Sequence, residues 1–341
     1  MKKVLMVNLD VGSGIEYCGN IFTCWLRERE DLILEVMKDQ NPSTIIVDQI
    51  IKILPDIIVL NEQFDRVFQA VYYYKKFNPR TKVLLLNHSW KNIMVKCEDA
   101  RNDIDSIKWQ FNRTFFDETC DIIINLNCKP KSVEWPLYVK NKMIDSYFPV
   151  DQSFMNSTEW SSRKRMFLIF GSIGPLRVSE EFISCIAGTN LHIDCYGRMD
   201  GKEEYMSKFN KCKELVYKGI VPQEKVSDVL NQYKYFIMPH NGTEIFNISL
   251  LQAILCGTIP VVCNDRNSKN FDYTWIDWAD GLYFGCYRAS DLVHNLLKLS
   301  AEKPDLSEVS NHISKLASEK FSYKKVKLIF SVAMKYLMED R

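Results

Sequence analysis

Hydrophobic residues along the chain gather in short runs that are rich in Val and Ile, and longer segments with helical periodicity separate these runs. This pattern is typical of parallel strands that helices bury on both faces. The sequence therefore predicts an α/β fold with two doubly wound, Rossmann-like domains. The runs that we expect to form strands fall into two sets: Val4–Leu9, Ile57–Leu60, Val83–Leu86 and Ile122–Leu126, then Phe167–Phe170, His192–Tyr196, Tyr235–Met238 and Pro260–Cys263.

A connection between the two sets is indicated near Pro149. The segment Ser146–Asp151 contains this helix-breaking proline, and the polar stretch Gln152–Arg165 follows it. We predict an N-terminal domain over residues 1–148, a second domain over 149–320, and a C-terminal helix over 321–341 that could pack back on the N-terminal domain. Ligands of such sheets bind at the carboxyl ends of the strands, so two sheets that face one central cleft suit an enzyme with two substrates.

The composition is that of a globular protein, with 46% hydrophobic and 26% charged residues, and 341 residues suffice for two domains. Eleven cysteines without a C-x-x-C pair indicate a reducing compartment, so we expect a cytoplasmic protein. The apolar run after Lys3 is too short for a signal peptide, and no segment is long enough to span a bilayer. Contact with a membrane surface stays open, and a net charge of +1 points to no particular partner.

The most informative segment is Met238–Val262. A strand ends at Pro239, a polar loop follows, and a helix from about Phe246 ends at Gly257. The helix is apolar nearly all round, so we expect it to be buried. Its first turn leaves backbone N–H groups without helical partners, and together with the helix dipole they form an anion site suited to a diphosphate. The residues of this turn are Asn247, Ile248 and Ser249.

In the same segment Glu244 stands eight residues before Gln252, and the range Gly257–Val262 reads Gly-Thr-Ile-Pro-Val-Val. This arrangement resembles the retaining GT-B glycosyltransferases, which carry a glutamate, seven residues and a second glutamate before a Gly-x-Pro-Val-Val segment. The resemblance implies that Glu244 lies against the donor sugar and that Gln252 holds the ribose. Glutamine replaces the second glutamate here, and its amide oxygen still accepts a hydrogen bond from a hydroxyl.

Three further segments resemble the same family. Tyr147–Phe154 is similar to its Asn-Gly-Val-Asp-x-x-x-Phe linker, and Gly171–Arg177 is similar to its Gly-Arg-Leu-x-x-x-Lys loop. The loop implies that Arg177 holds the donor pyrophosphate, whereas Ser172 replaces the second cation of the family pattern. Tyr217–Pro222 is similar to the Phe-x-Gly-x-Val turn, which implies that Gly219 and Val221 lie by the nucleobase.

The first half of the chain carries weaker similarities, in Gly12 and Gly14 after the first strand and in His88 after the third run. They stand where the family approaches the reacting sugar. The resemblance as a whole implies a hexosyl- or pentosyltransferase that uses a nucleotide-sugar, in the first place a UDP-sugar, and retains the anomeric configuration. Arg177 and the helix N-terminus would stabilise the leaving phosphate, Glu244 the positive charge of the sugar, and His88 would orient a sugar hydroxyl.

This chemistry needs neither a metal nor a cofactor besides the donor itself. Asp103 and Asp105 superficially form the metal-binding D-x-D of the other glycosyltransferase architecture. They lie in a charged, helix-like stretch that no strand precedes, so we do not expect them to bind a metal.

A polyanionic acceptor is suggested by Arg66–Cys97, which contains seven basic residues, no acidic ones and several aromatics. Its acceptor-side candidates are Lys75, Lys76 and Lys91. Two acceptor classes stay open: a hydroxymethylated DNA base, as in phage DNA modification, and a cell-envelope glycan or lipopolysaccharide at an anionic membrane. The stretch could equally be a solvated surface. An alternative of another class is a catalytically inactive GT-B scaffold that acts as a binding module, which Gln252 and Ser172 favour.

Overall fold

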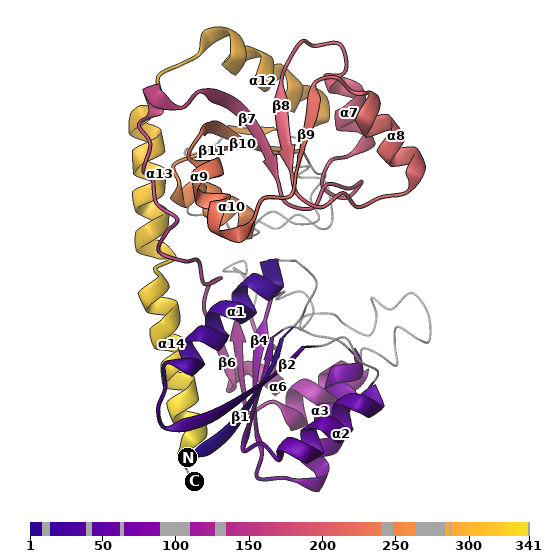
Figure 1. Ribbon diagram of the computed structural model, residues 1–341, viewed down its shortest axis with the longest axis vertical. Coiled ribbons are helices and arrows are strands. Elements are labelled where there is room, and N and C mark those ends of the chain that lie inside the picture. The colour runs from indigo at the N-terminus through magenta and orange to yellow at the C-terminus, as the bar shows by residue number, and fades with distance from the viewer. Residues whose placement is uncertain are drawn as a thin grey trace. The chain divides into compact units, whose positions relative to one another are not determined.

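The computed structural model describes residues 1–8, 14–38, 43–61, 65–88, 110–126, 134–239, 248–263, 284–286 and 288–339. The chain divides into two compact units (Figure 1). The first consists of Met1–Pro149 and Phe321–Arg341, and the second is Val150–Lys320. The division lies beside Pro149, and the last helix of the chain belongs to the first unit.

The first unit is built on a parallel sheet of six strands in the order β2-β1-β3-β4-β5-β6. This order places β1 and β3 side by side, so the chain crosses over after β2 and then proceeds outward in one direction. The strands in sheet order are β2 (Leu32–Lys38), β1 (Lys2–Asn8), β3 (Ile57–Asn61), β4 (Lys82–Asn87), β5 (Ile122–Asn125) and β6 (Met143–Asp145).

Helices cover both faces of this sheet (Figure 1). Apolar side chains of α2 and α3 close a core with one face of the strands. On α1, Phe22 and Trp25 pack against Phe330 of α14, with ring centroids 4.8 and 5.9 Å apart. The helices are α1 (Gly14–Arg27), α2 (Ser43–Ile53), α3 (Asp65–Phe77), the π-helical turn η2 (Phe115–Thr119), α6 (Leu137–Lys140) and α14 (Tyr323–Met338).

The second unit repeats the architecture with a parallel sheet in the order β12-β11-β10-β7-β8-β9. Side chains of α7, α8 and α12 form its main core with one face of the strands. The strands in sheet order are β12 (Phe284–Cys286), β11 (Ile259–Cys263), β10 (Tyr233–Met238), β7 (Arg165–Phe170), β8 (Ile193–Tyr196) and β9 (Leu215–Gly219). The helices are η3 (Trp160–Ser162), α7 (Glu180–Ile186), α8 (Glu203–Lys211), η4 (Gln223–Lys225), α9 (Val226–Leu230), α10 (Ile248–Leu255), α12 (Ala289–Glu302) and α13 (Ser307–Lys320).

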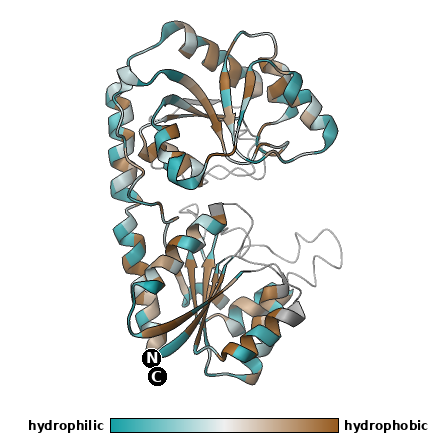
Figure 2. Cartoon of the chain, in the orientation of Figure 1, coloured by the Kyte–Doolittle hydropathy of each residue, from teal (hydrophilic) through white to brown (hydrophobic). Residues whose placement is uncertain are grey.

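All eight runs that the hydrophobic pattern marked as strands are strands, and the expected α/β class with two doubly wound domains is confirmed. Figure 2 shows the hydrophobic colour concentrated on the central strands of each unit. The pattern did not mark β2, β6, β9 or β12. Within the described parts of the chain, no helix is both long and apolar enough to cross a bilayer.

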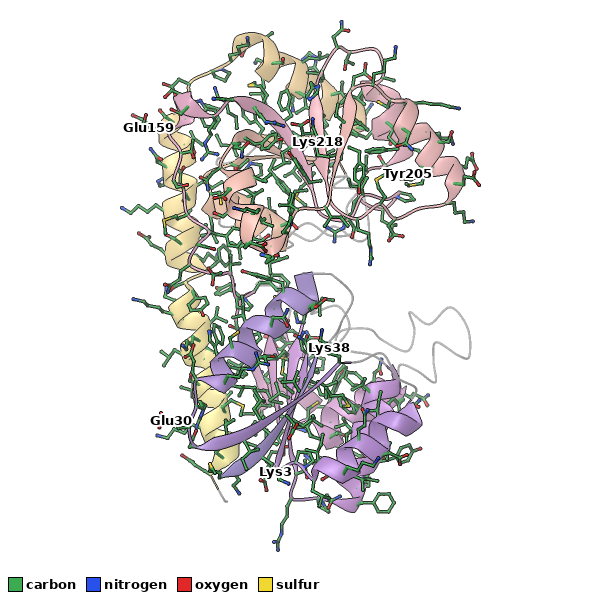
Figure 3. The ribbon with its side chains drawn as sticks, viewed as in Figure 1. Lys3, Glu30, Lys38, Glu159, Tyr205 and Lys218 are labelled. Carbon is green, nitrogen blue, oxygen red and sulfur yellow. The ribbon has the colours of Figure 1, made fainter. Side chains whose placement is uncertain are left out.

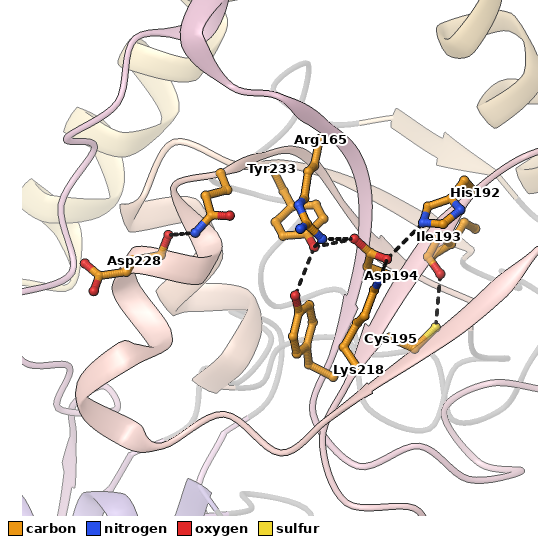
Figure 4. A network of polar contacts seen from close by, with 10 residues as sticks. Arg165, His192, Ile193, Asp194, Cys195, Lys218, Asp228 and Tyr233 are labelled. Carbon is orange, nitrogen blue, oxygen red and sulfur yellow. Dashed lines mark hydrogen bonds and ion pairs between the residues drawn. The ribbon is translucent and has the colours of Figure 1, made fainter.

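A buried carboxylate links four strands of the second sheet (Figure 4). Asp194 on β8 is 2% exposed, and its Oδ2 accepts hydrogen bonds from Arg165 Nη1 at 2.5 Å and from the Tyr233 hydroxyl at 2.6 Å. Its Oδ1 lies 3.0 Å from His192 Nε2 and 3.2 Å from Lys218 Nζ. Burial alone would raise the pKa of this carboxyl, but these hydrogen bonds outweigh burial and hold the pKa below its usual range. Because β7 and β10 begin at two of these residues, the network stabilises the amino-terminal side of the sheet, away from the strand ends where ligands bind.

Candidate functional site

Two glycines bring the carboxyl ends of β7 and β8 close together. Gly171 follows β7 with φ of +125°, and Gly197 follows β8 with φ of +135°, a backbone conformation that favours glycine. The amide of Gly171 donates to the carbonyl of Tyr196 at 3.0 Å. A Cβ atom on Gly197 would lie 1.7 Å from the carbonyl oxygen of Gly171, so no other residue fits there.

The loop from Gly171 to Arg177 is fixed along its length by backbone contacts. Ile173 donates to the carbonyl of Arg198 at 2.8 Å and accepts from the amide of Asp200 at 2.7 Å. The hydroxyl of Tyr205 on α8, labelled in Figure 3, donates to the carbonyl of Val178 at 2.9 Å. A cavity of about 460 Å³ opens beside the loop, with Arg177 and Tyr205 in its wall. The backbone therefore holds Arg177 at a defined place above the strand ends.

Arg177 and Ser249 meet above Gly171. A Cβ atom on Gly171 would lie 3.4 Å from Nη1 of Arg177 and 3.5 Å from Oγ of Ser249. One residue comes from the loop after β7 and the other from the first turn of α10, so two elements far apart in sequence deliver a guanidinium and a hydroxyl to one spot. A guanidinium, a hydroxyl and the first turn of a helix are groups that bind phosphate oxygens.

The helix predicted to end at Gly257 is present as α10, which the structure describes over Ile248–Leu255. Gly257 has φ of +72° and ends the helix in the left-handed region. The expected burial is confirmed for the residues from Leu250 onward, including Gln252, which is 4% exposed. Gln252 stands three residues after Ser249 and so lies one turn further along the same helix face. Glu244 and Asn247 lie outside the described residues.

The nucleobase candidates lie at the same edge of the sheet, at its outer strand. Gly219 is the last residue of β9 with φ of +87°, and no described atom lies within 4 Å of the place of its missing Cβ. Val221 is half-buried in the loop that follows. One strand, β8, lies between β9 and the strand that precedes Arg177. The structure therefore brings Arg177 and Ser249 together and places Gly219 and Val221 further along the same sheet edge.

Four neighbouring strands of the first sheet each end in a buried asparagine. These residues are Asn8 on β1, Asn61 on β3, Asn87 on β4 and Asn125 on β5. The hydrophobic pattern and the motifs did not mark these asparagines as site residues. The signal was nevertheless present, because an apolar run followed at once by Asn occurs at the end of each of these strands.

His88 follows β4 and joins this row. The ring is 7% exposed and burial lowers its pKa to about 3, so it is neutral at physiological pH. Its Nε2 lies 2.8 Å from Oδ1 of Asn61. The amide nitrogen of Asn61 donates to Oδ1 of Asn8 at 2.8 Å and to the carbonyl of Ile15 at 2.9 Å, and Asn8 in turn donates to Oδ1 of Asn20 at 3.0 Å.

A second chain of hydrogen bonds continues from the neighbouring residue. Asn87 donates to Oδ1 of Asn125 at 3.1 Å, and Asn125 donates to Oδ1 of Asp145 at 3.1 Å. Asp145 also accepts from Trp135 Nε1 at 3.2 Å. Of the glycine candidates, Gly14 is the first residue of α1 and Gly12 lies outside the described residues.

The premise that Arg66–Cys97 lacks counterions is wrong for its described lysines. Lys75 Nζ lies 2.6 Å from Asp121 and Lys76 Nζ lies 2.8 Å from Glu118. Both lysines stand in the last turn of α3, on the side of the sheet where β4 begins, about 20 Å along the strand from His88. They therefore do not surround the strand end that carries His88. Lys91, Asp103 and Asp105 lie outside the described residues.

No family model matches the chain, and no curated protein matches it in sequence. Solved structures of similar fold nevertheless cover nearly its whole length. HepE of Anabaena in complex with UDP-glucose is 10% identical, with 98% of this chain and 100% of that chain covered and a TM-score of 0.71. A glycosyltransferase from Rickettsia africae is 9% identical, with 100% and 99% covered and a TM-score of 0.60. A putative UDP-N-acetylglucosamine 2-epimerase from Listeria monocytogenes is 11% identical, with 99% and 98% covered and a TM-score of 0.59.

These likenesses establish the fold, which is the two-domain GT-B architecture that the sequence predicted. They do not by themselves establish the reaction, because both a glycosyltransferase and a putative epimerase share it. The names of the Anabaena and Listeria proteins have a uridine nucleotide-sugar in common.

Proposed function

We propose that the protein is a retaining glycosyltransferase that moves a hexosyl or pentosyl group from a UDP-sugar to an acceptor hydroxyl. The observation that carries the proposal is the convergence of Arg177 and Ser249 above Gly171. The diphosphate of the donor lies over Gly171, whose missing side chain leaves the space, and the amides of Ile248 and Ser249 donate to it from the first turn of α10. The UDP-glucose complex of HepE, a protein of the same fold, supports this choice of donor.

The remaining donor contacts follow the motif resemblance. Gln252 binds the ribose hydroxyls from the face of α10 that also carries Ser249, and Gly219 and Val221 lie by the uracil. Asn247 adds its amide to the phosphate site, and Glu244 lies against the sugar and stabilises the positive charge that develops when the bond to phosphate breaks.

Departure of UDP builds negative charge on the leaving phosphate, and Arg177 with the α10 amides stabilises this charge. A bound metal is not required for this role, so the reaction needs no cofactor. His88 orients a hydroxyl of the sugar or of the acceptor through its neutral imidazole. Gly12 and Gly14 leave room for the acceptor above β1.

The acceptor is either a hydroxymethylated DNA base or a glycan or lipid of the cell envelope, and in the second case the protein contacts the membrane at its periphery. Lys75 and Lys76 carry no part of the proposal, because both are paired. Among the described residues eight cysteines are free thiols, which supports the proposal of a reducing compartment such as the cytoplasm. An inactive scaffold, which the replacements at Ser172 and Gln252 favour, would bind the donor and leave it unchanged.

Calorimetric titration of UDP and UDP-glucose in the presence of EDTA tests the donor site. Arg177→Met should weaken binding by an order of magnitude or more, since it removes the only charged group of the pair above Gly171. Arg165→Met is the matched control, because this arginine lies on the same sheet and binds Asp194 on its amino-terminal side. That variant should lose stability and keep its affinity. Equal affinity of Arg177→Met and the wild type would remove Arg177 from the donor site.

A further inference from the structure

The hydrogen bonds around His88 have a direction that one backbone carbonyl determines. The carbonyl oxygen of Ile15 can only accept, and the Asn61 side-chain atom 2.9 Å away must therefore be the amide nitrogen. The other end of this amide, Oδ1, then faces His88 and can also only accept. It follows that Nε2 of His88 carries a hydrogen and donates it to Asn61 over 2.8 Å.

The surroundings hold this arrangement in place. Asn61 also donates to Asn8 over 2.8 Å, and turning its amide over would place oxygen against oxygen at both Asn8 and Ile15. Gly19 lets helix α1 approach this pair, since a Cβ atom there would lie 2.0 Å from Oδ1 of Asn8 and 2.3 Å from the amide nitrogen of Asn61. The amide of Asn61 is therefore locked on three sides, by Asn8, by α1 and by His88.

We infer that Asn61 is a positioning residue, which holds the neutral ring of His88 in the tautomer protonated at Nε2 and thereby makes Nδ1 a hydrogen-bond acceptor. A neutral imidazole carries a single N–H, and its second nitrogen has a lone pair. In this tautomer Nδ1 can accept a hydrogen bond and cannot donate one. The catalytic significance of this tautomer rests on the proposed function, in which His88 orients a sugar or acceptor hydroxyl.

The tautomer itself is measurable without any substrate. In protein with ¹⁵N-labelled histidine, a long-range ¹H–¹⁵N correlation spectrum distinguishes protonated from unprotonated ring nitrogens. The chain has five histidines, and the signals that vanish in His88→Gln belong to His88. The wild type at pH 7.5 should show one neutral tautomer with the proton on Nε2. A proton on Nδ1, or an even mixture, would overturn the inference.

Asn61→Leu removes the acceptor and should shift the His88 signals toward the other tautomer or a mixture. Asn125→Leu is the matched control, an equally buried asparagine at the end of β5 that binds Asn87 and Asp145, and it should leave the His88 signals in place. An unchanged Nε2 tautomer in Asn61→Leu would overturn the inference. Should that variant fail to fold, Asn61→Ala replaces it. It removes the same acceptor with a smaller side chain, so an unchanged Nε2 tautomer in Asn61→Ala would equally overturn the inference.

Turnover measurements distinguish a failure of the positioning role of Asn61 from a failure of the proposed function. In Asn61→Leu the rate of UDP release from UDP-sugar should fall about tenfold while the Kd for UDP stays within twofold. A normal rate in Asn61→Leu with a displaced tautomer would overturn the positioning role and leave the glycosyltransferase proposal intact. Absence of turnover in the wild type would contradict the glycosyltransferase proposal, and the spectra would still decide the tautomer.

Discussion

Burial decides the charge of His88, and this has a consequence for stability. The pKa of the ring falls from 6.5 to about 3 because the imidazolium would lose its hydration in the folded chain. Below about pH 6.5 the unfolded chain takes up a proton at this histidine that the folded chain does not. The neutral ring therefore makes its full contribution to the free energy of unfolding above pH 6.5. This contribution is lost progressively as the pH falls toward the pKa of the ring in the folded chain.

Denaturant unfolding of the wild type and of His88→Gln at pH 7, 6, 5 and 4 should detect this linkage. The wild type should lose stability below pH 6.5 faster than the variant, by up to about 1.4 kcal/mol per pH unit. The comparison of slopes is independent of any constant loss caused by the substitution. Parallel pH dependences of the two proteins would contradict a neutral His88.

A substitution at Gly171 allows the effect of backbone strain to be distinguished from the effect on the proposed UDP site. Gly171→Ala adds a Cβ atom at the place where Arg177 and Ser249 meet, so it should cost about 1–3 kcal/mol of stability and also weaken UDP binding by an order of magnitude or more. Gly188→Ala is the control, because φ is +80° and no described atom lies within 4 Å of its new Cβ. Loss of UDP affinity in both variants alike would mean that backbone strain, and not the site, causes the effect.

At the residue scale the sequence named Arg177 and Ser249 as phosphate-site candidates, and the structure brings both close to Gly171, whereas the sequence pattern did not mark the asparagine row. Arg177 could be named because a loop motif surrounds it. Asn8 and Asn61 could not, since an asparagine after an apolar run is also an ordinary turn residue. Only the strand order β1-β3-β4, which no local pattern contains, brings Asn8, Asn61 and His88 side by side.

Among the elements, α14 shows how the end of the chain stabilises the first unit. Its Phe330 is 2% exposed and packs on Phe22 and Trp25 of α1, and Trp25 Nε1 donates to the hydroxyl of Tyr323 at 2.6 Å. Leu328 on the same helix is 64% exposed. The helix therefore has one face that belongs to the core of this unit and one that does not.

Alanine substitutions on the two faces should differ sharply. Phe330→Ala removes a buried ring and should lower the free energy of unfolding by about 3–5 kcal/mol, whereas Leu328→Ala should change it by less than about 0.5 kcal/mol. Urea unfolding followed by circular dichroism measures both. Similar losses from the two variants would contradict the packing of α14 on α1.

The strands that the sequence failed to predict are the four edge strands of the two sheets, β2, β6, β9 and β12. A central strand is buried on both faces and reads as a continuous apolar run. An edge strand has fewer buried positions and tolerates charge. Glu35 thus interrupts β2, and Lys218 interrupts β9. Prediction from hydrophobic runs succeeds for the middle of such sheets and fails at their borders for this reason.

The missing counterions of Lys75 and Lys76 are found at the scale of the whole chain. No carboxylate is near them in sequence, but the fold supplies Glu118 and Asp121 from the turn before β5. A count of charges along one segment cannot show ion-pair partners that lie beside the next strand of the sheet. The search for the acceptor site should therefore begin at the carboxyl ends of the first sheet, where His88 lies.

The whole molecule has a fold that both glycosyltransferases and a putative epimerase use. The reaction must therefore be identified from the product that the protein forms from the donor. We expect catalysis without a divalent ion, because Arg177 and the first turn of α10 stabilise the negative charge of the leaving phosphate. An epimerase would return a UDP-sugar of altered configuration. An inactive scaffold would return the donor unchanged.

Incubation of the purified protein with UDP-glucose and with UDP-N-acetylglucosamine in excess EDTA, followed by ³¹P and ¹H NMR, tests the central claim most directly. The account predicts slow release of UDP together with free sugar from at least one donor, faster when an acceptor is added, and loss of this release in Arg177→Met. A donor recovered intact or epimerised, or turnover that strictly requires added Mg²⁺ or Mn²⁺, would contradict it.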